Sequence, residues 1–224
     1  MSKHREELIT CPSCGESSKF LIWESVNTVI DPEMKEKVRS REIFQFTCPE
    51  CGTKTMVNYD CLYHQMEDKV MIYLVPGDMA DAELMMKGYI RDDKGNIIEN
   101  PYEKEMDMDG YHKRVVGSMN DFMEKLYILD AGYDDRIIEL MKVFMISQLQ
   151  EEKEFSYEEF LFAQNRDGSY GFHVNQGNDK WGNVDFIPEL YEQVKEIFLP
   201  VVEEAEQEVI IDLAWAVSVL KNQS

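Results

Sequence analysis

Two copies of the motif Cys-Pro-x-Cys-Gly, at residues 11–15 and 48–52, restrict the folds open to this chain more than any other feature. The proline after the first cysteine holds φ near about −65°, which suits a tight turn. The glycine after the second cysteine easily adopts the left-handed backbone that such a turn requires. Four thiolates in two such units are typical of a closed tetrahedral site, most often structural zinc. The metal ligands predicted from the sequence are Cys11, Cys14, Cys48 and Cys51.

Other uses of paired cysteines fit this sequence less well. Residues 1–7 contain no apolar signal peptide, so we expect a cytoplasmic protein rather than a disulfide framework. A thioredoxin-like pair would begin a helix, whereas glycine and strand-forming residues follow each pair here. A catalytic zinc site usually keeps one open position, which four thiolates close. Iron in a rubredoxin-like site remains the alternative to zinc, because tetrahedral thiolate sites serve both metals.

The charge balance argues against nucleic acid and membrane partners. The 224 residues include 23 Lys and Arg against 44 Asp and Glu, a formal net charge of −21. Affinity for duplex DNA or anionic lipid depends on neutralising phosphates, which an acidic surface opposes. No stretch approaches the ~20 apolar residues of a membrane span. We therefore expect no binding to duplex DNA and no membrane association, although one basic cluster is formed by Lys35, Lys37, Arg39 and Arg41.

The apolar periodicity predicts an α+β protein in three parts. β-branched and aromatic runs flank the cysteine motifs, so residues 1–77 are predicted to form a zinc-ribbon-like antiparallel β domain. Residues 78–117 are charged and punctuated by turn residues, and we interpret them as a linker or an irregular excursion. Residues 118–224 are predicted to be a helical C-terminal part with a β-hairpin at 155–174. Within it, 201–220 is predicted to be a long helix, apolar around much of its circumference.

Several motifs together resemble those of the CpXC domain proteins, a bacterial and archaeal family named for the paired cysteine motif. Besides the cysteines, they are Val-Ile-Asp-Pro at 29–32 and Leu-Tyr-His at 62–64. The resemblance covers about residues 8–130, and the stretch 134–140 is similar to the segment after this domain in longer members. It implies that the same four cysteines are the metal ligands. The family is functionally uncharacterised, so no activity is implied. Asp often follows Tyr-His in the family, and Gln65 here argues against a catalytic His–Asp pair.

A few further residues have two interpretations each. We interpret Cys61 as a small buried apolar residue rather than a reactive thiol. His64 is interpreted as a hydrogen-bonded structural histidine, the alternative being a fifth ligand or a general base. Asp134 and Asp135 are interpreted as residues that complement a helix dipole, the alternatives being internal pairing or cation binding. The 14 methionines are interpreted as adaptable core residues, the alternative being an adaptable binding groove.

These features favour a structural role over catalysis. No Ser-His-Asp order, phosphate-binding loop, dinucleotide fingerprint or His-Glu-x-x-His motif is present. We predict a cytoplasmic zinc-binding protein without catalytic activity that acts as a protein-interaction module. The apolar surplus of 201–220 favours a homodimer or a protein partner, and the sequence identifies no small-molecule ligand. The alternatives are a rubredoxin-like iron electron carrier and an enzyme with a site near His64.

Overall fold

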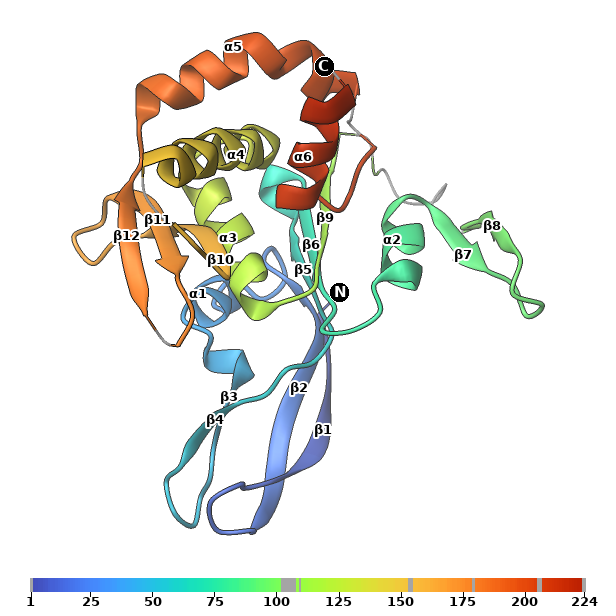
Figure 1. The fold of residues 1–224 in the computed structure, drawn as a ribbon. Coiled ribbons are helices and arrows are strands. Elements are labelled where there is room, and N and C mark those ends of the chain that lie inside the picture. Colours follow the sequence, from blue (N-terminus) through green and yellow to red (C-terminus); the bar gives the residue numbers. More distant parts are fainter. Residues whose placement is uncertain are drawn as a thin grey trace. The chain divides into compact units, whose positions relative to one another are not determined.

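The computed structural model describes residues 2–101, 108, 110–152, 155–178, 180–204 and 207–222. It divides into two compact units, Met1–Phe122 and Met123–Ser224 (Figure 1). The first unit contains β1 (Lys3–Thr10), β2 (Ser17–Asn27), α1 (Met34–Arg39), η1 (Glu42–Phe44), β3 (Gln45–Thr47), β4 (Lys54–Met56), β5 (Cys61–Gln65), η2 (Met66–Asp68), β6 (Val70–Leu74), α2 (Ala80–Met86), β7 (Tyr89–Arg91), β8 (Ile97–Glu99) and β9 (His112–Val116). Helix α3 (Met119–Asp130) runs across the boundary, and the second unit continues with α4 (Asp135–Glu152), β10 (Glu159–Gln164), β11 (Tyr170–Asn175), β12 (Trp181–Asp185), α5 (Pro188–Glu204) and α6 (Leu213–Asn222). Within the described residues, every helix is too short or too polar to cross a membrane.

A five-stranded sheet with the order β1-β2-β5-β6-β9 forms the centre of the first unit (Figure 1). The pairs β1–β2 and β5–β6 are antiparallel, but β2–β5 and β6–β9 are parallel. The prediction of a purely antiparallel domain is therefore wrong. Alternating apolar residues identify a strand but not its direction, and parallel neighbours require long crossover connections. One crossover here carries α1 and the β3–β4 hairpin, and the other carries α2 and the β7–β8 hairpin.

The segment 78–117, which the sequence suggested was a linker or an irregular excursion, contributes a strand to this sheet. β9 pairs with β6 from Val70↔His112 to Leu74↔Val116. The same segment contains α2 and the β7–β8 hairpin, while its residues 102–107 and 109 lie outside the described part. The charged, glycine-punctuated composition that suggested a linker thus belongs to a crossover connection and its short elements.

Side-chain alternation gives the sheet of the first unit one buried face. Every second residue of β5 and of β6 is buried, and the residues between them are half-buried. On the buried face, the rings of Tyr63 and Phe44 meet Phe122 edge-on, with centroid distances of 6.3 and 6.1 Å. Such edge-to-face pairs stabilise a core beyond the area they bury. On the half-buried face, His64 of β5 and Met71 of β6 are among the residues that line a cavity.

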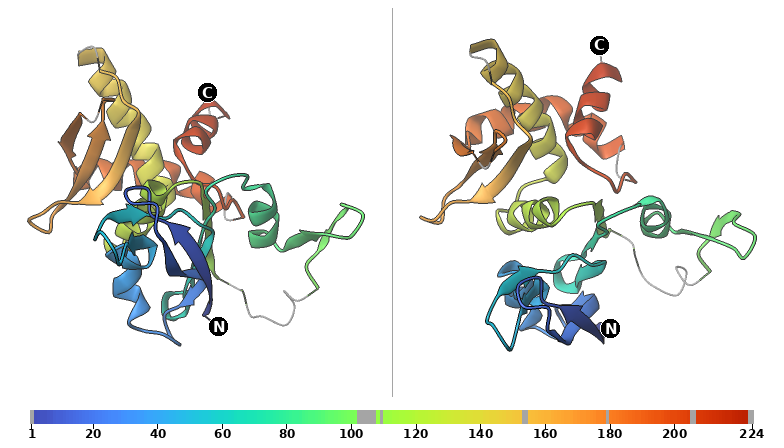
Figure 2. Two further views of the ribbon diagram at one scale, coloured as in Figure 1. Left: turned by 90° about the horizontal axis from the view of Figure 1, so that it is seen from below. Right: turned by 60° about the horizontal axis from the view of Figure 1, so that its bottom comes forward.

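The second unit has an apolar core of its own, built from α4, the sheet β10–β12 and the two C-terminal helices. Both views of Figure 2 show α4 beside this sheet. The hairpin predicted at 155–174 is confirmed, because β10 and β11 pair antiparallel from Glu159↔Asn175 to Gln164↔Tyr170. The third strand, β12, pairs antiparallel with β11 and was not predicted. Its sequence, Trp-Gly-Asn-Val-Asp, has too few strand-forming residues to indicate a strand by itself.

The prediction of one long helix over 201–220 is wrong. The structure has α5 and α6 in its place, with a non-helical segment before α6. Asp212 begins α6 as an N-cap, since its Oδ1 accepts a hydrogen bond of 2.8 Å from the Trp215 N–H. Val209 and Ile211, in the non-helical segment, are buried. They continue the apolar pattern without being helical, so part of the predicted surplus surface is covered within the chain.

A network of charged side chains is buried on α3 and α4. Its members are each at most 5% exposed and are Glu124, Lys125, Asp135, Glu139 and Lys142. Lys142 lies 2.6 Å from Glu124 and 3.0 Å from Glu139, and Lys125 lies 3.1 Å from Asp135 and 3.0 Å from Glu139. Three carboxylates face two ammonium groups, and burial raises the pKa of Glu124 to about 7. The sequence did not predict this network. Helical periodicity identifies an apolar face, and it gives no reason to expect charged side chains to be buried there.

The acidic pair at the start of α4 is used inside the protein. Asp134 accepts two hydrogen bonds from the Arg136 guanidinium, at 3.0 Å from Nε and 2.7 Å from Nη2. Asp135 is the partner of Lys125 in the buried network. Internal pairing, the alternative given for these two aspartates, therefore occurs.

Candidate metal centre

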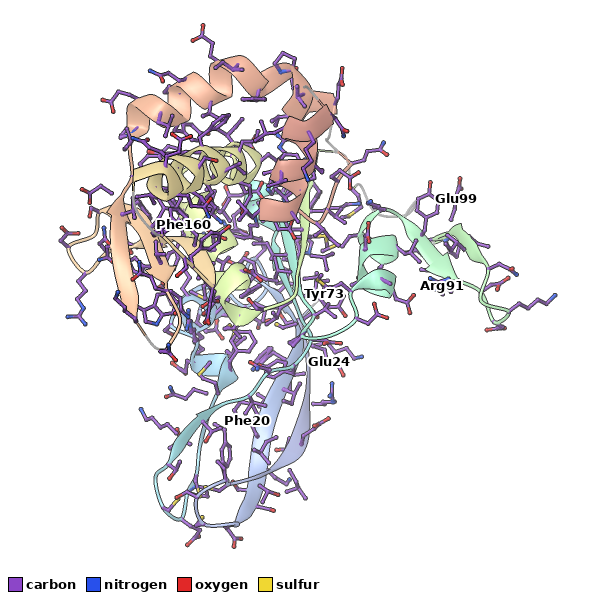
Figure 3. All side chains as sticks on the ribbon, viewed as in Figure 1. Phe20, Glu24, Tyr73, Arg91, Glu99 and Phe160 are labelled. Carbon is purple, nitrogen blue, oxygen red and sulfur yellow. The ribbon has the colours of Figure 1, made fainter. Side chains whose placement is uncertain are left out.

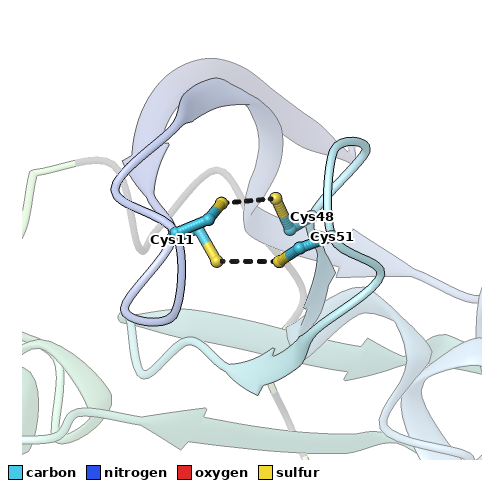
Figure 4. A group of neighbouring side chains, drawn as sticks. Cys11, Cys48 and Cys51 are labelled. Atoms are coloured by element: carbon cyan, nitrogen blue, oxygen red, sulfur yellow. Dashed lines mark hydrogen bonds between the residues drawn. The ribbon is translucent and has the colours of Figure 1, made fainter.

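The four cysteines of the two motifs meet at one end of the first unit. Cys11 and Cys14 lie in the loop between β1 and β2, and Cys48 and Cys51 lie in the loop between β3 and β4. Their sulfur atoms all lie within 4.8 Å of one another, and the group can hold a metal ion. Two contacts link the loops, Cys11 to Cys51 and Cys14 to Cys48, both 3.6 Å between sulfurs (Figure 4).

The two loops repeat the same backbone hydrogen bonds. In the first, the Gly15 N–H donates to the Cys11 carbonyl at 3.0 Å, and the Cys11 N–H donates to the Glu16 carbonyl at 2.8 Å. In the second, Gly52 donates to Cys48 at 3.0 Å, and Cys48 donates to the Thr53 carbonyl at 2.9 Å. Gly15 and Gly52 have φ of 76° and 71°, the left-handed region in which a Cβ is unfavourable. The glycines of the motif are therefore required by the backbone.

The sulfur geometry fits a tetrahedral metal site. Four sulfurs placed about 2.3 Å from a central ion, as around zinc, stand about 3.8 Å from one another. The two pairs that link the loops, at 3.6 Å between sulfurs, agree with such an edge. A disulfide would need about 2.05 Å between sulfurs, and all five cysteines of the chain are free. The arrangement thus matches a four-sulfur site with no open coordination position.

The electrostatics of the cluster also favour the binding of a cation. Hydrogen bonds with the Thr53 side chain and backbone lower the pKa of Cys51 to about 6, which favours its thiolate. At Cys14 the backbone amide of Glu16 lowers the pKa, but hydrogen bonds with the neighbouring thiols and desolvation raise it to about 12. Four thiolates at this spacing repel one another unless a positive ion lies between them. The hydrogen bonds of the protein favour the thiolate of Cys51, and a metal ion would stabilise all four.

The cluster continues into a small apolar core, here called the ribbon tip. Cys11 and Cys48 are each 1% exposed, whereas Cys14 and Cys51 are exposed. The six residues of the ribbon tip are Ile9, Cys11, Phe20, Phe46, Cys48 and Val57. Phe20 meets Phe46 edge-on at 5.9 Å and lies between the β1–β2 and β3–β4 hairpins (Figure 3). Two of the four sulfurs are therefore part of this small apolar core.

The fifth cysteine and the candidate histidine do not join the cluster. Cys61, in β5, is fully buried, and burial raises its pKa to about 12, so its thiol stays protonated and unreactive. This confirms its interpretation as a buried apolar residue. His64 is half-buried, with its Nε2 2.9 Å from the hydroxyl of Tyr111, and burial lowers its pKa. It is a hydrogen-bonded histidine, as predicted, but its partner lies 47 residues away and was not foreseen.

The basic cluster, three residues of α1 and Arg41, makes contacts within the protein. Arg39 donates from Nη1 to the Tyr63 hydroxyl at 2.7 Å and from Nη2 to the Gln65 side-chain oxygen at 3.3 Å. Lys35 lies 3.6 Å from the carboxylate of Glu67. These contacts direct two of the four basic groups toward their own unit.

Comparison with known proteins identifies the family. A family model described as CpXC protein matches residues 9–142, which is more than half of the chain. The match includes both cysteine motifs and extends the resemblance of about residues 8–130 into α4. The comparisons with curated proteins and with solved structures found no significant match. Because the family model covers the four clustered cysteines and most of the first unit, this chain belongs to the CpXC protein family.

Proposed function

We propose that the four cysteines bind one structural zinc ion and that the protein is a zinc-stabilised interaction protein. The observation that carries this proposal is the set of four clustered sulfurs. Each of the two sulfur pairs that link the loops is separated by 3.6 Å. A site with no open position has no place for a substrate or an activated water, so its role is structural. The zinc would hold the β1–β2 and β3–β4 hairpins together.

Iron is the competing metal, and it would indicate an electron carrier instead. The same four thiolates suit either ion, and two of them, Cys14 and Cys51, are exposed, as electron transfer would require. Metal analysis of the purified chain together with its visible spectrum separates the two functions. One equivalent of zinc in a colourless protein supports the proposal, and one equivalent of iron in a red protein overturns it.

The ligand set is tested in the same experiment with variants. Cys51→Ser should lose the metal, because an alcohol is a poor zinc ligand at neutral pH. Cys61→Ala is the matched control, since it removes a buried thiol outside the cluster. Retention of one metal equivalent by Cys51→Ser would show that the four-cysteine assignment is wrong.

We propose that the partner is a protein, either another molecule or a second copy of this chain. Support comes from apolar side chains that stay exposed in the second unit: Ile197 at 68%, Leu199 at 40% and Phe144 at 39%. Light scattering on the intact chain and on Ile197→Glu tests self-association; Glu192→Gln, at another exposed position of α5, is the control. A monomer at all micromolar concentrations would exclude the homodimer and leave a different protein as partner.

Duplex DNA is not proposed as a partner. The net charge of −21 opposes it, and Arg39 and Lys35 already have partners within the first unit. A mobility-shift assay at about 0.15 M salt, where the Debye length is about 8 Å, should show no binding at micromolar protein. Salt-sensitive binding that is lost in Arg41→Gln would contradict this expectation.

A further inference from the structure

Helix α5 has one buried side and one exposed side. Tyr191, Val194 and Val202 are buried and belong to the apolar core of the second unit. Within that unit α5 packs against α4, and it lies over α4 in Figure 1. Ile197 and Leu199, in the C-terminal half of α5, remain 68% and 40% exposed. Exposed apolar side chains rimmed by polar groups are typical of protein-interaction sites.

Acidic side chains surround these two apolar residues. Glu196 precedes Leu199 by three residues and Glu203 follows it by four, while Glu204 follows Ile197 by seven. Residues at these spacings share one side of a helix. All three glutamates are exposed. This exposed set, here called the α5 face, consists of Glu196, Ile197, Leu199, Glu203 and Glu204.

The carboxylates of the α5 face have no cationic partner among the described residues. None of the three glutamates forms an ion pair there. Lys195, the single basic residue of α5, is half-buried and has its Nζ 5.9 Å from the centre of the Tyr191 ring. Residues 196–220 include six Asp and Glu but no Lys, Arg or His. The surrounding sequence therefore adds negative charge and no compensating cation.

The backbone of α5 adds to the negative potential of this face. A helix has partial negative charge at its C-terminus, and the last turn of α5 contains Glu203 and Glu204 but no basic residue. Pro200 has no N–H, so it cannot donate the helical hydrogen bond to the carbonyl of Glu196. Carboxylates in the last turn lower the stability of their own helix. Their position is therefore better explained by a cation from another molecule than by the stability of α5.

We propose that the α5 face binds a basic, amphipathic segment of another protein, in which Lys or Arg side chains alternate with apolar ones. This inference rests on the proposed interaction function and gives the chemistry of the partner. The exposed Ile197 and Leu199 favour a protein over a metal ion, and the carboxylates repel nucleic acid. A second copy of the chain would bring two α5 faces of the same charge together, which is unfavourable.

Fluorescence anisotropy with three labelled amphipathic peptides tests the charge preference of the intact, metal-loaded chain. The peptides share a leucine face, and their polar positions are all Lys, all Gln or all Glu. We expect one Leu/Lys peptide to bind per chain, at least about tenfold more tightly than the Leu/Gln peptide, because charge-assisted hydrogen bonds replace neutral ones. The Leu/Glu peptide should not bind. Equal affinities for the Lys and Gln peptides, or no binding of the Lys peptide, would overturn the proposal.

Variants separate the α5 face from the net charge of the chain. The α5 variant replaces the three glutamates of this face: Glu196→Gln, Glu203→Gln and Glu204→Gln. Its control replaces three exposed glutamates of the first unit: Glu33→Gln, Glu36→Gln and Glu42→Gln. The α5 variant should bind the Leu/Lys peptide about tenfold more weakly, and the control within about twofold of the unmodified chain, because salt screens distant charges. Equal weakening by both variants would overturn the assignment of the site.

The apolar part of the face has its own test. Ile197→Ser should weaken binding of the Leu/Lys peptide severalfold, because it removes apolar surface that the peptide would cover. Ile98→Ser, at an exposed apolar position of β8 in the first unit, is the matched control and should leave the affinity unchanged. Unchanged affinity of Ile197→Ser would show that apolar contact contributes nothing, and it would overturn the amphipathic character of the partner.

Hydrogen exchange distinguishes a binding role of the three glutamates from a structural one. The α5 variant should keep or increase the amide protection of α5, because it removes charges that oppose the helix dipole. The Leu/Lys peptide should increase protection in the C-terminal half of α5 of the unmodified chain and leave β1 to β4 unchanged. Lower protection of α5 in the variant, or peptide-induced protection confined to other elements, would overturn the proposal.

Light scattering distinguishes failure of this inference from failure of the interaction function. A dimer of the intact chain that dissociates in Ile197→Glu would assign the α5 face to a second copy. That result would overturn the basic partner and leave the interaction function in place. The metal analysis tests the zinc function separately, since no residue of the α5 face is among the clustered cysteines.

Discussion

The ribbon tip of the first unit and the core of the second unit contrast in composition and in size. The ribbon tip has three fully buried members, and two of them, Cys11 and Cys48, are candidate metal ligands. The core cluster of the second unit has fifteen buried apolar residues in the described part of the chain, among them Phe160, Phe162 and Phe172. Only the second cluster is large enough to offset the conformational entropy of the elements that it joins.

The difference shows two ways of stabilising a fold within one chain. Fully burying one large apolar side chain contributes about 1.5–3 kcal/mol, so the few in the ribbon tip add little. A structural zinc ion contributes an apparent 10–16 kcal/mol in small zinc-binding peptides, which is approximately the contribution of several such side chains. We therefore expect the stability of the ribbon tip to depend on a bound metal ion, and the stability of the second unit to be the same with and without it.

Loss of the metal should produce the largest difference in stability between the two regions. Cys48→Ser, or removal of the metal by a chelator, should unfold the ribbon tip and cost several kcal/mol or more, because the binding free energy of such a site is folding free energy. Hydrogen exchange should then show lost protection in β1 to β4 and retained protection in α4 and β10 to β12.

Cys61→Ala serves as the control for this experiment, because its thiol lies outside the cluster. It should keep its metal and lose only the stability expected for one small buried side chain. A Cys48→Ser variant with unchanged protection of β3 and β4 would show that the ribbon tip does not need its metal.

The buried charges of the second unit provide the complementary test. Lys142→Met should destabilise this unit by about 3–5 kcal/mol, because the carboxylates of Glu124 and Glu139 lose a buried partner. Metal content should not change. Chemical denaturation measures the effect. Lys19→Met, which breaks an exposed pair with Glu6, should cost far less stability, because solvent screens exposed ion pairs. Similar losses for both lysines would mean that the network is hydrated.

The two regions should respond to pH in opposite directions. The pKa of Glu124 in the folded protein, about 7, lies above its ordinary value of 4.5, so the folded state holds a proton that the unfolded state releases. Its stabilising effect is present below about pH 4.5 and is lost as the pH rises to about 7, by up to about 3 kcal/mol. The ribbon tip should instead weaken as the pH falls, because protonated thiols release the metal.

Unfolding of Glu124→Gln as a function of pH isolates this group. The variant keeps a side-chain oxygen to accept the hydrogen bond of the Phe162 N–H but does not titrate. Its stability curve should be flatter between pH 4.5 and 7 than that of the unmodified chain. Identical slopes would mean that Glu124 is ionised in the folded protein throughout this range.

The smallest expected effect concerns the turns of the two loops that contain the clustered cysteines. Gly52→Ala places a Cβ on a residue with φ of 71° and should cost about 1–2 kcal/mol of ribbon stability from backbone strain, with no steric clash. Gly77→Ala is the control, because it has no positive φ and also meets no atom within 4 Å. Competition with a zinc chelator should detect the difference in metal affinity, and equal affinities of the two variants would contradict the strain argument.

Local patterns accounted for what was predicted correctly. The cysteine cluster could be foreseen because each loop is completed within five residues, by a proline, two cysteines and a glycine with positive φ. The hairpin of β10 and β11 could be foreseen for the same reason, since a turn and two adjacent strands specify it. The family resemblance rested on these same local motifs.

Non-local pairing decided what was predicted incorrectly. The sheet order of the first unit depends on crossovers that bring β2 beside β5 and β6 beside β9, and apolar alternation carries no information about strand direction. The break between α5 and α6 depends on the Asp212 cap, which competes with a continuous apolar pattern.

The amino-acid sequence by itself determined which cysteines cluster as candidate metal ligands, the acidic composition and the alternation that makes strands, because these depend on residue type and short spacing. Only the tertiary structure decided which strands adjoin, which charges are buried and which side chains line the cavity. Asn27, His64, Met71 and Lys113 form one row only because four strands from distant parts of the chain pair in a particular register. A contact between residues far apart in sequence costs chain entropy that is repaid only by the complete fold, so no local pattern specifies it.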